Sequence, residues 1–425
     1  MTELVQQPGQ RSSADIAEYD RRISNVRALM RTHGLDIIIA NDEDRIVGLP
    51  PNSAKRQPPY ARYLSNFYIP SQLHPHSTTV IVPLSGDPVL IIPPGIKRSF
   101  VHLARSRSWI AKVVDSYVDD PTWEVRTRWG WFGSELASVI ADELRTLGAE
   151  HARIGLATAN ISVEDIGSRL PSAHFEKTLV DDGSGTPTDL LAPLLATNSE
   201  WEIGTLEVAH SGADAMTYAF IETARSGGSV REARAEAQAA GIRAGVEEMI
   251  LFGSIGADPF TYWDWSLAVD ESFRRGKLYF FQVAVACVNG YEVQSARSFV
   301  VGGHGAEQLS LMESVESSLS AIYGAIRPGI TGEELYSVGL KPIEAAGFEL
   351  WGQLGHSMGF KLHAGPRGVA LVPGNLHALT KHEAMVVHVC ALDKDNGNAA
   401  MVGDTILIED DGFRFLSAKP LGYEI

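Results

Sequence analysis

Residues 276–303 have the sequence GKLYFFQVAVACVNGYEVQSARSFVVGG, which contains the strongest structural signal in the chain. Two runs rich in β-branched and aromatic residues are joined there by Asn289 and Gly290. An Asn-Gly pair between two such runs indicates a β-hairpin, because both residues accept the positive φ angles of its tight turn. The second half of the chain is therefore expected to contain a sheet built around this hairpin.

Helical patterns lie on both sides of the hairpin, and Ser229 with Glu232 has the spacing of a capping box. The helices are expected over residues 199–227, 229–247, 306–325 and 332–346, and two closing strands near residues 384–392 and 403–409. Because strands and helices are mixed rather than strictly alternating, residues 193–425 are expected to form an α+β domain.

The first half of the chain alternates between strand and helix patterns. Residues 14–34 have helical apolar spacing and end at a glycine, and the buried strand LDIIIAND follows at residues 35–42. Further strands are expected at HSTTVIVP, DPVLIIPP and RIGLAT, with a helix at GSELASVIADELRTLGA. This pattern predicts an α/β domain over residues 14–192 after a flexible arm at residues 1–13. The proline-rich segment 48–63 is expected to be a long loop.

Composition narrows the functions. The net charge of −16 argues against a nucleic-acid-binding surface, which would need a basic stripe. The two cysteines, Cys287 and Cys390, imply no disulfide framework and a reducing compartment. No run of about 18 apolar residues indicates a membrane span, and the first residues have no apolar core typical of a signal peptide. A cytoplasmic protein is therefore expected, without nucleic-acid or membrane partners.

Several motifs resemble, in the same order, those of the creatinase/prolidase/methionine aminopeptidase family, also called the pita-bread family. They are the helix start at residues 198–202, the Asn-Gly-Tyr turn at 289–291 with an arginine at 297, Gly-His-Ser-Met-Gly at 355–359, and the strands at 385–387 and 403–405. The first half resembles the family's smaller domain through YLSNF at residues 63–67. The resemblance implies an α/β N-terminal domain followed by an α+β pita-bread domain.

The chain departs from the family at the metal ligands. Metal-dependent members bind divalent cations with two Asp, one His and two Glu, which suit hard cations. Counted from the hairpin turn, the Asp positions fall on Val283 and Gln294, and the Glu positions fall on or near Cys390 and Gly403. Only the histidine is kept, as His356. One histidine would leave the charge of a di-metal centre almost uncompensated, so no metal and no cofactor is expected.

Creatinase, the metal-free member, is the nearest in type, because GHSMG is close to its Gly-His-Ser-x-Gly. Its general-base histidine, however, would fall near Asp264 and Trp265, and its two carboxylates on Ala296 and Cys390. Strict creatine hydrolysis is therefore not expected.

Three histidines are the candidate catalytic groups: His356, His363 and His388. An imidazole exchanges protons near neutral pH, whereas the alternative for His356 is a structural role in a glycine-flanked turn. Arg367 is a candidate clamp for a substrate carboxylate, with a surface arginine as the alternative. His388 and Cys390 share a strand face, so the histidine is a candidate to stabilise a thiolate. The alternative is a half-buried core cysteine, which is also expected for Cys287.

The remaining candidates are substrate contacts. Gln294 replaces a ligand carboxylate with a neutral amide, and Glu292 is a replacement carboxylate if the strand is regular. The cluster Tyr262, Trp263, Asp264 and Trp265 is a candidate to hold a planar or cationic ligand, or equally to pack. His74 and His76 are candidates to enter the partner subunit's cleft, because the resemblance to creatinase places a substrate-binding group there. Arg297 is expected to make a structural ion pair.

Three functions remain open. The first is a metal-independent enzyme acting on a small polar metabolite by C–N bond hydrolysis or a lyase-type step. The second is a metalloenzyme with a rebuilt zinc site on His356, His388 and Cys390, which are suitable ligand types without a zinc-site spacing. The third is a non-catalytic binding or scaffold protein on the same fold.

The resemblance also predicts a homodimer in which the partner's N-terminal domain completes each cleft. The long segment at residues 48–63 fits this arrangement, because it needs a surface to cover. Sedimentation velocity at micromolar concentration is expected to give a species of about twice the chain mass, and a monomer under those conditions would contradict the prediction.

Overall fold

The computed structural model describes residues 12–41, 60–67, 78–92, 98–115, 132–157, 163–181, 187–254, 272–287, 289–360 and 368–418. The chain divides into two compact units, Met1–Leu195 and Ala196–Ile425. The boundary expected between residues 192 and 193 falls in the 3-10 helix Ala192–Leu195, at the end of the first unit. The expected flexible arm lies mostly outside the described residues.

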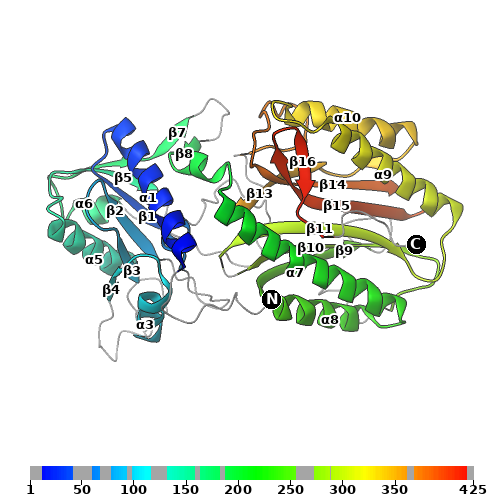
Figure 1. The fold of residues 1–425 in the computed structure, drawn as a ribbon, viewed down its shortest axis with the longest axis horizontal. Coiled ribbons are helices and arrows are strands. Elements are labelled where there is room, and N and C mark those ends of the chain that lie inside the picture. The colour runs from blue at the N-terminus through cyan, green and yellow to red at the C-terminus, as the bar shows by residue number, and fades with distance from the viewer. Residues whose placement is uncertain are drawn as a thin grey trace. The chain divides into compact units, whose positions relative to one another are not determined.

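The first unit is an α/β domain with a six-stranded sheet (Figure 1). The strand order is β4 (Lys112–Asp115), β3 (Val89–Ile92), β2 (Thr79–Pro83), β1 (Ile37–Asn41), β5 (Arg153–Ala157) and β6 (His174–Lys177). The helices are α1 (Ser13–His33), α2 (Tyr60–Ser65), α3 (Arg98–Arg107), α5 (Phe132–Thr146) and α6 (Val163–Gly167). The short strands β7 (Leu179–Asp181) and β8 (Pro187–Asp189) pair with each other.

The helix α1 agrees with its sequence signals. Ser12 and Asp15 form a capping box at its start, and Gly34, with φ of 66°, ends it in the left-handed conformation. The short helix α2 differs from expectation, because it occupies the last residues of the segment predicted as a loop. Tyr63 in α2 is 1% exposed and stacks on the guanidinium of Arg22, 4.2 Å from the ring centroid. The burial of Tyr63 was not predicted, because the residues before it are rich in proline and polar side chains.

The second unit is an α+β domain with an eight-stranded antiparallel sheet, as its sequence predicts. The strand order is β16 (Gly412–Phe415), β15 (Asn398–Glu409), β14 (Ala384–Asp393), β13 (Gly355–Phe360), β11 (Tyr291–Val300), β10 (Leu278–Cys287) and β9 (Val246–Ser254), with β12 (Glu349–Leu350) on β14. The helices are α7 (Glu200–Arg225), α8 (Val230–Arg243), α9 (Ala306–Ala325) and α10 (Gly332–Ala345).

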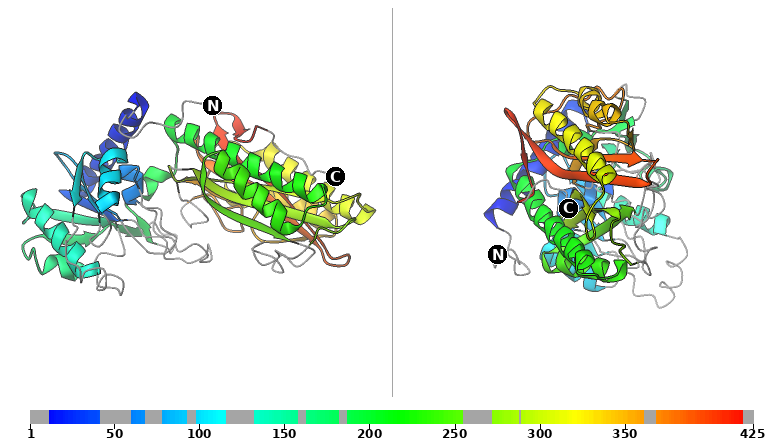
Figure 2. Two further views of the ribbon diagram at one scale, coloured as in Figure 1. Left: turned by 90° about the horizontal axis from the view of Figure 1, so that it is seen from below. Right: turned by 90° about the vertical axis from the view of Figure 1, so that its right-hand side faces the viewer.

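One face of this sheet is covered by helices, and we call it the outer face. The helix α7 runs along β10 and β11 in two views of the unit (Figures 1 and 2), and its Phe220 stacks on Phe281 at a ring-centroid distance of 3.8 Å. Farther along the sheet, Met385 and Val387 of β14 belong to the core that contains Leu311 of α9. Because strand side chains alternate between faces, the other residues of these strands point to the opposite, inner face.

Two element boundaries differ from the sequence prediction. The helix α8 ends at Arg243, and the residues after it turn at Gly245, with φ of 91°, into β9. The expected helix continued to residue 247. The closing strand β15 begins at Asn398 instead of residue 403, because its first residues pair with β14 in a long hairpin. None of the helices in the described part of the chain is long and apolar enough to cross a bilayer.

A buried carboxylate holds the loop that leads into β14. Glu383, whose side chain is 4% exposed, lies 2.7 Å from Nε2 of His377 through its Oε1 atom. It also accepts a hydrogen bond from the amide of Thr380 at 2.5 Å. The hydrogen bond to Glu383 raises the pKa of His377 above its usual value.

This pair predicts a pH-dependent contribution to stability. Since the folded pKa of His377 is raised, its contribution is fully present below the unfolded pKa of about 6.5 and is lost as pH rises through the folded value. The ring is 35% exposed, so the contribution is expected to be less than about 1 kcal/mol. Replacing His377 with Gln should therefore cost more stability at pH 5.5 than at pH 9 in urea unfolding.

The exposed His304 supplies the matched control, because its ring is open to solvent and its Nδ1 atom lies 3.4 Å from the adjacent carbonyl of Gly305. His304→Gln measures the effect of losing an imidazole that has no buried carboxylate partner of the Glu383 kind. Equal losses for His377→Gln at both pH values would contradict the assignment.

Candidate functional site

The inner face carries two glutamines side by side. Nε2 of Gln282 in β10 donates to Oε1 of Gln294 in β11 at 3.1 Å, and both residues are buried. The hairpin register places Ala284 directly opposite Gln294, so the residues Gln282, Ala284 and Gln294 share one face. A pair of neutral amides therefore lies where the family resemblance predicts a ligand carboxylate.

This register corrects the predicted position of the first carboxylate. Val283 pairs with Ser295, and Phe281 on the same face stacks on Phe220 of α7. Val283 therefore points to the outer face, away from Gln294. Counting residues along the chain gave the wrong parity, whereas counting pairs across the turn would have selected Gln282 or Ala284. Gln282 is the inner-face residue that the sequence interpretation missed.

His356 lies in the strand β13 and not in the turn that its flanking glycines predicted. It pairs with Val386 of β14, which points to the inner face, and its residue is 4% exposed. Its Nδ1 atom lies 3.0 Å from the carbonyl oxygen of Ser357. A carbonyl can only accept, so Nδ1 is the donor, and the neutral imidazole carries its lone pair on Nε2.

At Gly359 the alternation of side chains between the two faces is interrupted in β13. Its φ angle is 140°, which L side chains rarely adopt. It lies opposite Glu292 of the inner face, and the next residue, Phe360, packs on Tyr291 of the outer face at a centroid distance of 5.3 Å. His356 can therefore face inward with β14 while the strand end packs outward against the hairpin.

The two histidines of the sheet converge. His388 in β14 is 7% exposed, and its ring centroid lies 5.3 Å from that of His356 with the planes at 72°. The sequence prediction that His388 and Cys390 share a face agrees with the regular strand β14. Glu292 also shares a face with Gln294, because β11 pairs with β10 without a bulge from Leu278 to Ala286.

Cys390 does not have the environment of a reactive thiol. It is 0% exposed and packs in an apolar cluster with Phe280, Ala296 and Met401. Burial raises the pKa of this thiol above its usual value, which favours the alternative of a core cysteine over a thiolate stabilised by His388. Cys287, expected in the core, is buried as well, and burial raises its pKa to about 11.

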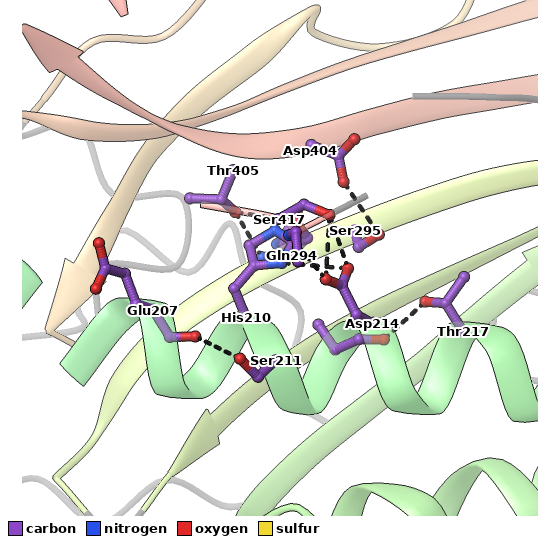
Figure 3. Close-up of polar contacts among 12 residues, drawn as sticks. Glu207, His210, Ser211, Asp214, Thr217, Gln294, Ser295, Asp404, Thr405 and Ser417 are labelled. Atoms are coloured by element: carbon purple, nitrogen blue, oxygen red, sulfur yellow. Dashed lines mark hydrogen bonds and ion pairs between the residues drawn. The ribbon is translucent and has the colours of Figure 1, made fainter. Parts of the chain in front are cut away.

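Polar contacts join β11 and β15 near the glutamine pair (Figure 3). The Thr405 hydroxyl accepts from the amide of Gln294 at 2.8 Å and donates to the carbonyl of the same residue at 2.9 Å. On the outer face, Asp404 pairs with Arg297 at 2.8 Å. It also accepts from the Ser295 hydroxyl at 3.3 Å. The structural ion pair expected for Arg297 is confirmed.

A second polar network lies on α7 (Figure 3). Asp214 accepts from the Ser417 hydroxyl at 2.9 Å and from the Ala418 amide at 3.2 Å, and Nδ1 of the buried His210 lies 3.4 Å away. These hydrogen bonds lower the pKa of Asp214, although burial acts in the opposite direction. The network fastens the chain after β16 to α7.

The residues at the predicted ligand positions do not fit a di-metal centre. Val283 is aliphatic, Gln294 is a neutral amide, the Cys390 thiol is buried in an apolar cluster, and Gly403 has no side chain. Across the described ranges, no group of three or more His, Cys, Asp or Glu side chains is arranged to hold a metal ion. Hard divalent cations need carboxylate oxygens that these positions do not supply.

Some predicted site residues lie outside the described residues. They are His74, His76, Tyr262, Trp263, Asp264, Trp265, His363 and Arg367. The structure therefore brings together His356, His388, Gln294 and Glu292 on one face and leaves the other candidates as predictions.

The sequence comparisons agree with this architecture. Residues 205–410 match the model of metallopeptidase family M24. The Xaa-Pro dipeptidase of Pyrococcus furiosus is 26% identical over 234 residues, which are 54% of this chain and 65% of that protein. The probable dipeptidase PepE of Mycobacterium tuberculosis is 27% identical over 198 residues, 44% of this chain and 52% of PepE. The matches therefore span less than two thirds of each of these relatives.

Solved structures resemble the chain over nearly its whole length. The prolidase of Pyrococcus horikoshii has a TM-score of 0.69 at 19% identity, covering 94% of this chain and 99% of that one. The X-Pro aminopeptidase of Thermotoga maritima has a TM-score of 0.69 at 17% identity, covering 94% and 100%. At these identities the likeness concerns the fold alone.

The fold is thus that of the two-domain α/β and α+β pita-bread proteins. In its second unit, residues 205–410 are similar to metallopeptidase family M24, and the whole chain is similar in fold to prolidases and X-Pro aminopeptidases.

Proposed function

We propose that this protein is a metal-independent enzyme that acts on a small polar metabolite at the inner face of its second unit. The observation that carries the proposal is the pair of buried imidazoles, His356 and His388, with ring centroids 5.3 Å apart on the face that bears the predicted ligand positions. The family match supports a hydrolase, because the relatives found are dipeptidases.

The contact of His356 with Ser357 supports a role as the acid-base group. Its Nδ1–H is held by the carbonyl of Ser357, so Nε2 is the atom that exchanges a proton. In the hydrolysis of a C–N bond, Nε2 accepts a proton from water as the C–O bond forms. The proton then passes to the leaving nitrogen as the C–N bond breaks. A lyase-type step would use the same atom to remove a proton from carbon.

Binding without catalysis remains the second candidate, because the same inner face suits a polar ligand. Gln294 and Glu292 offer amide and carboxylate groups to such a ligand, and both are buried beside the small residues Ala284 and Ala286. A rebuilt zinc site is not favoured, because Cys390 packs in an apolar cluster and no group of three or more His, Cys, Asp or Glu side chains in the described ranges is arranged around an ion.

The metal independence has a direct test. The protein purified without added metal is expected to contain less than about 0.1 equivalent of zinc, manganese or iron, and chelation should leave ligand binding unchanged. The reason is the loss of carboxylates at the ligand positions. Elemental analysis checks the first expectation and thermal shift with and without chelator the second. One or two equivalents of bound metal would overturn the proposal.

His356 has its own test. A thermal-shift screen of small polar metabolites identifies a ligand, and turnover of that ligand is then measured. His356→Ala is expected to lower the rate by about 100- to 10,000-fold, which is the usual contribution of a general acid or base. The unfolding temperature should change little, and His304→Ala serves as an exposed control.

The alternatives give different results in the same experiment. If the protein only binds, the ligand stabilises wild type but no product forms. If His356 only supports the fold, activity and unfolding temperature fall together. Full activity of His356→Ala would place the chemistry at another group.

A further inference from the structure

The neighbouring strands β13 and β15 lie unusually close to the backbone of β14 at residues 386–388. Gly355 of β13 pairs with Val387, and Gly403 of β15 pairs with His388. A Cβ atom on Gly355 would lie 2.4 Å from the carbonyl oxygen of Val386. A Cβ atom on Gly403 would lie 2.3 Å from the carbonyl oxygen of Val387 and 2.5 Å from Cα of His388.

These contacts leave no space for a side chain at either position. Real Cβ atoms essentially never lie within 3.0 Å of another heavy atom, and the atoms met here are mainly backbone atoms of a central strand. A rotamer change of a neighbour cannot relieve such a contact, so the strand itself would have to move. Gly155, by contrast, would meet only side-chain atoms.

The same contacts explain how the imidazoles come together. His356 follows Gly355 directly in β13, and His388 is the residue that pairs with Gly403. The distance between the two rings therefore depends on how closely β13 and β15 lie against Val386–His388. Gly403 is also one of the positions where the family resemblance predicts a ligand glutamate.

We propose that Gly355 and Gly403 are positioning residues: they hold β13 and β15 against β14, fix the His356–His388 pair, and exclude any ligand side chain at position 403. This inference rests on the proposed metal-independent function. It adds that the missing glutamate cannot be restored by a single substitution, because the strand backbone already fills its place.

The positioning role is tested with Gly355→Ala and Gly403→Ala in the full chain. Gly204→Ala in α7 and Gly324→Ala in α9 are matched controls, because no heavy atom lies within 4 Å of a Cβ at either position. The imidazole signals of His356 and His388 are followed by NMR of histidine-labelled protein and assigned with His356→Gln and His388→Gln.

Both test variants are expected to shift the two imidazole signals and to lower the unfolding temperature by about 5 °C or more, as overpacking of a core does. The controls should leave the imidazole signals unchanged and should not lower the unfolding temperature, because alanine is favoured over glycine inside a helix. Lower stability with unchanged imidazole signals would make the glycines merely structural and overturn the positioning role. Unchanged stability and unchanged signals would overturn the close contact itself.

The exclusion of a ligand is tested with restored carboxylates. Q294D/C390E is compared with Q294D/C390E/G403E for binding of Mn²⁺ and Zn²⁺ by calorimetry and elemental analysis. The third carboxylate is expected to add no bound metal and to lower the unfolding temperature, whereas Gly204→Glu should not lower it. If G403E adds a metal equivalent or tightens binding tenfold, position 403 is open and the inference fails.

These outcomes are separate from those of the proposed function. Metal bound to the wild-type protein would contradict the metal independence, whatever the variants show. A closed position 403 in a protein that turns over no ligand would leave the inference standing and remove only the enzyme assignment. If the triple variant does not fold, Gly403→Ala with its NMR signals decides the question.

Discussion

The second unit depends on a buried ion pair between β11 and β15. Arg297 reaches Asp404, which is 0% exposed, at 2.8 Å, and also donates to the carbonyl of Gly403 at 3.0 Å. Removing one partner of such a pair typically costs about 3–5 kcal/mol, because the other charge stays buried. The pair acts where the two strands meet, at Ser295 opposite Asp404 and Ala296 opposite Gly403. It therefore sets the register of the strand that brings Gly403 against His388.

The alternation of strand side chains then separates two kinds of residue. The outer face receives the helices and the ion pair, and its aromatic contacts, such as Phe220 on Phe281, anchor α7. The inner face receives the amides Gln282 and Gln294 and the imidazoles. A shift of one residue in β11 would exchange the two sets, so the buried ion pair and the inner-face site require the same register. The chemistry of the inner face is thus tied to the stability of the outer one.

The elements of the second unit could be predicted well from sequence, because their signals are local. The Asn-Gly turn, the capping boxes of α7 and α8, and the helical periodicity of α9 and α10 each depend on a few neighbouring residues. The candidate site was harder, because it depends on pairing. Val283 was assigned to the wrong face by counting along one strand. The close contact of Gly403 with β14 depends on strand pairing, which the sequence does not show. The buried thiol of Cys390 likewise follows from packing that no local pattern reveals.

Electrostatics explains why the carboxylates that the family resemblance predicts on the inner face are replaced together. A carboxylate-rich site is stable when divalent cations balance its charge, and without metal the buried carboxylates would repel one another at a high cost. Here an amide, a thiol and a glycine stand at positions where the family resemblance predicts carboxylates: Gln294, Cys390 and Gly403. An amide and a glycine carry no charge, and burial raises the pKa of the Cys390 thiol, so these three positions offer a cation no carboxylate. At Gly403 the backbone of β14 also lies where a side chain would begin, so this position lacks both the charge of a ligand carboxylate and the space for it. Among the described residues of this face, the groups that can transfer a proton are the imidazole pair and the buried carboxylate of Glu292.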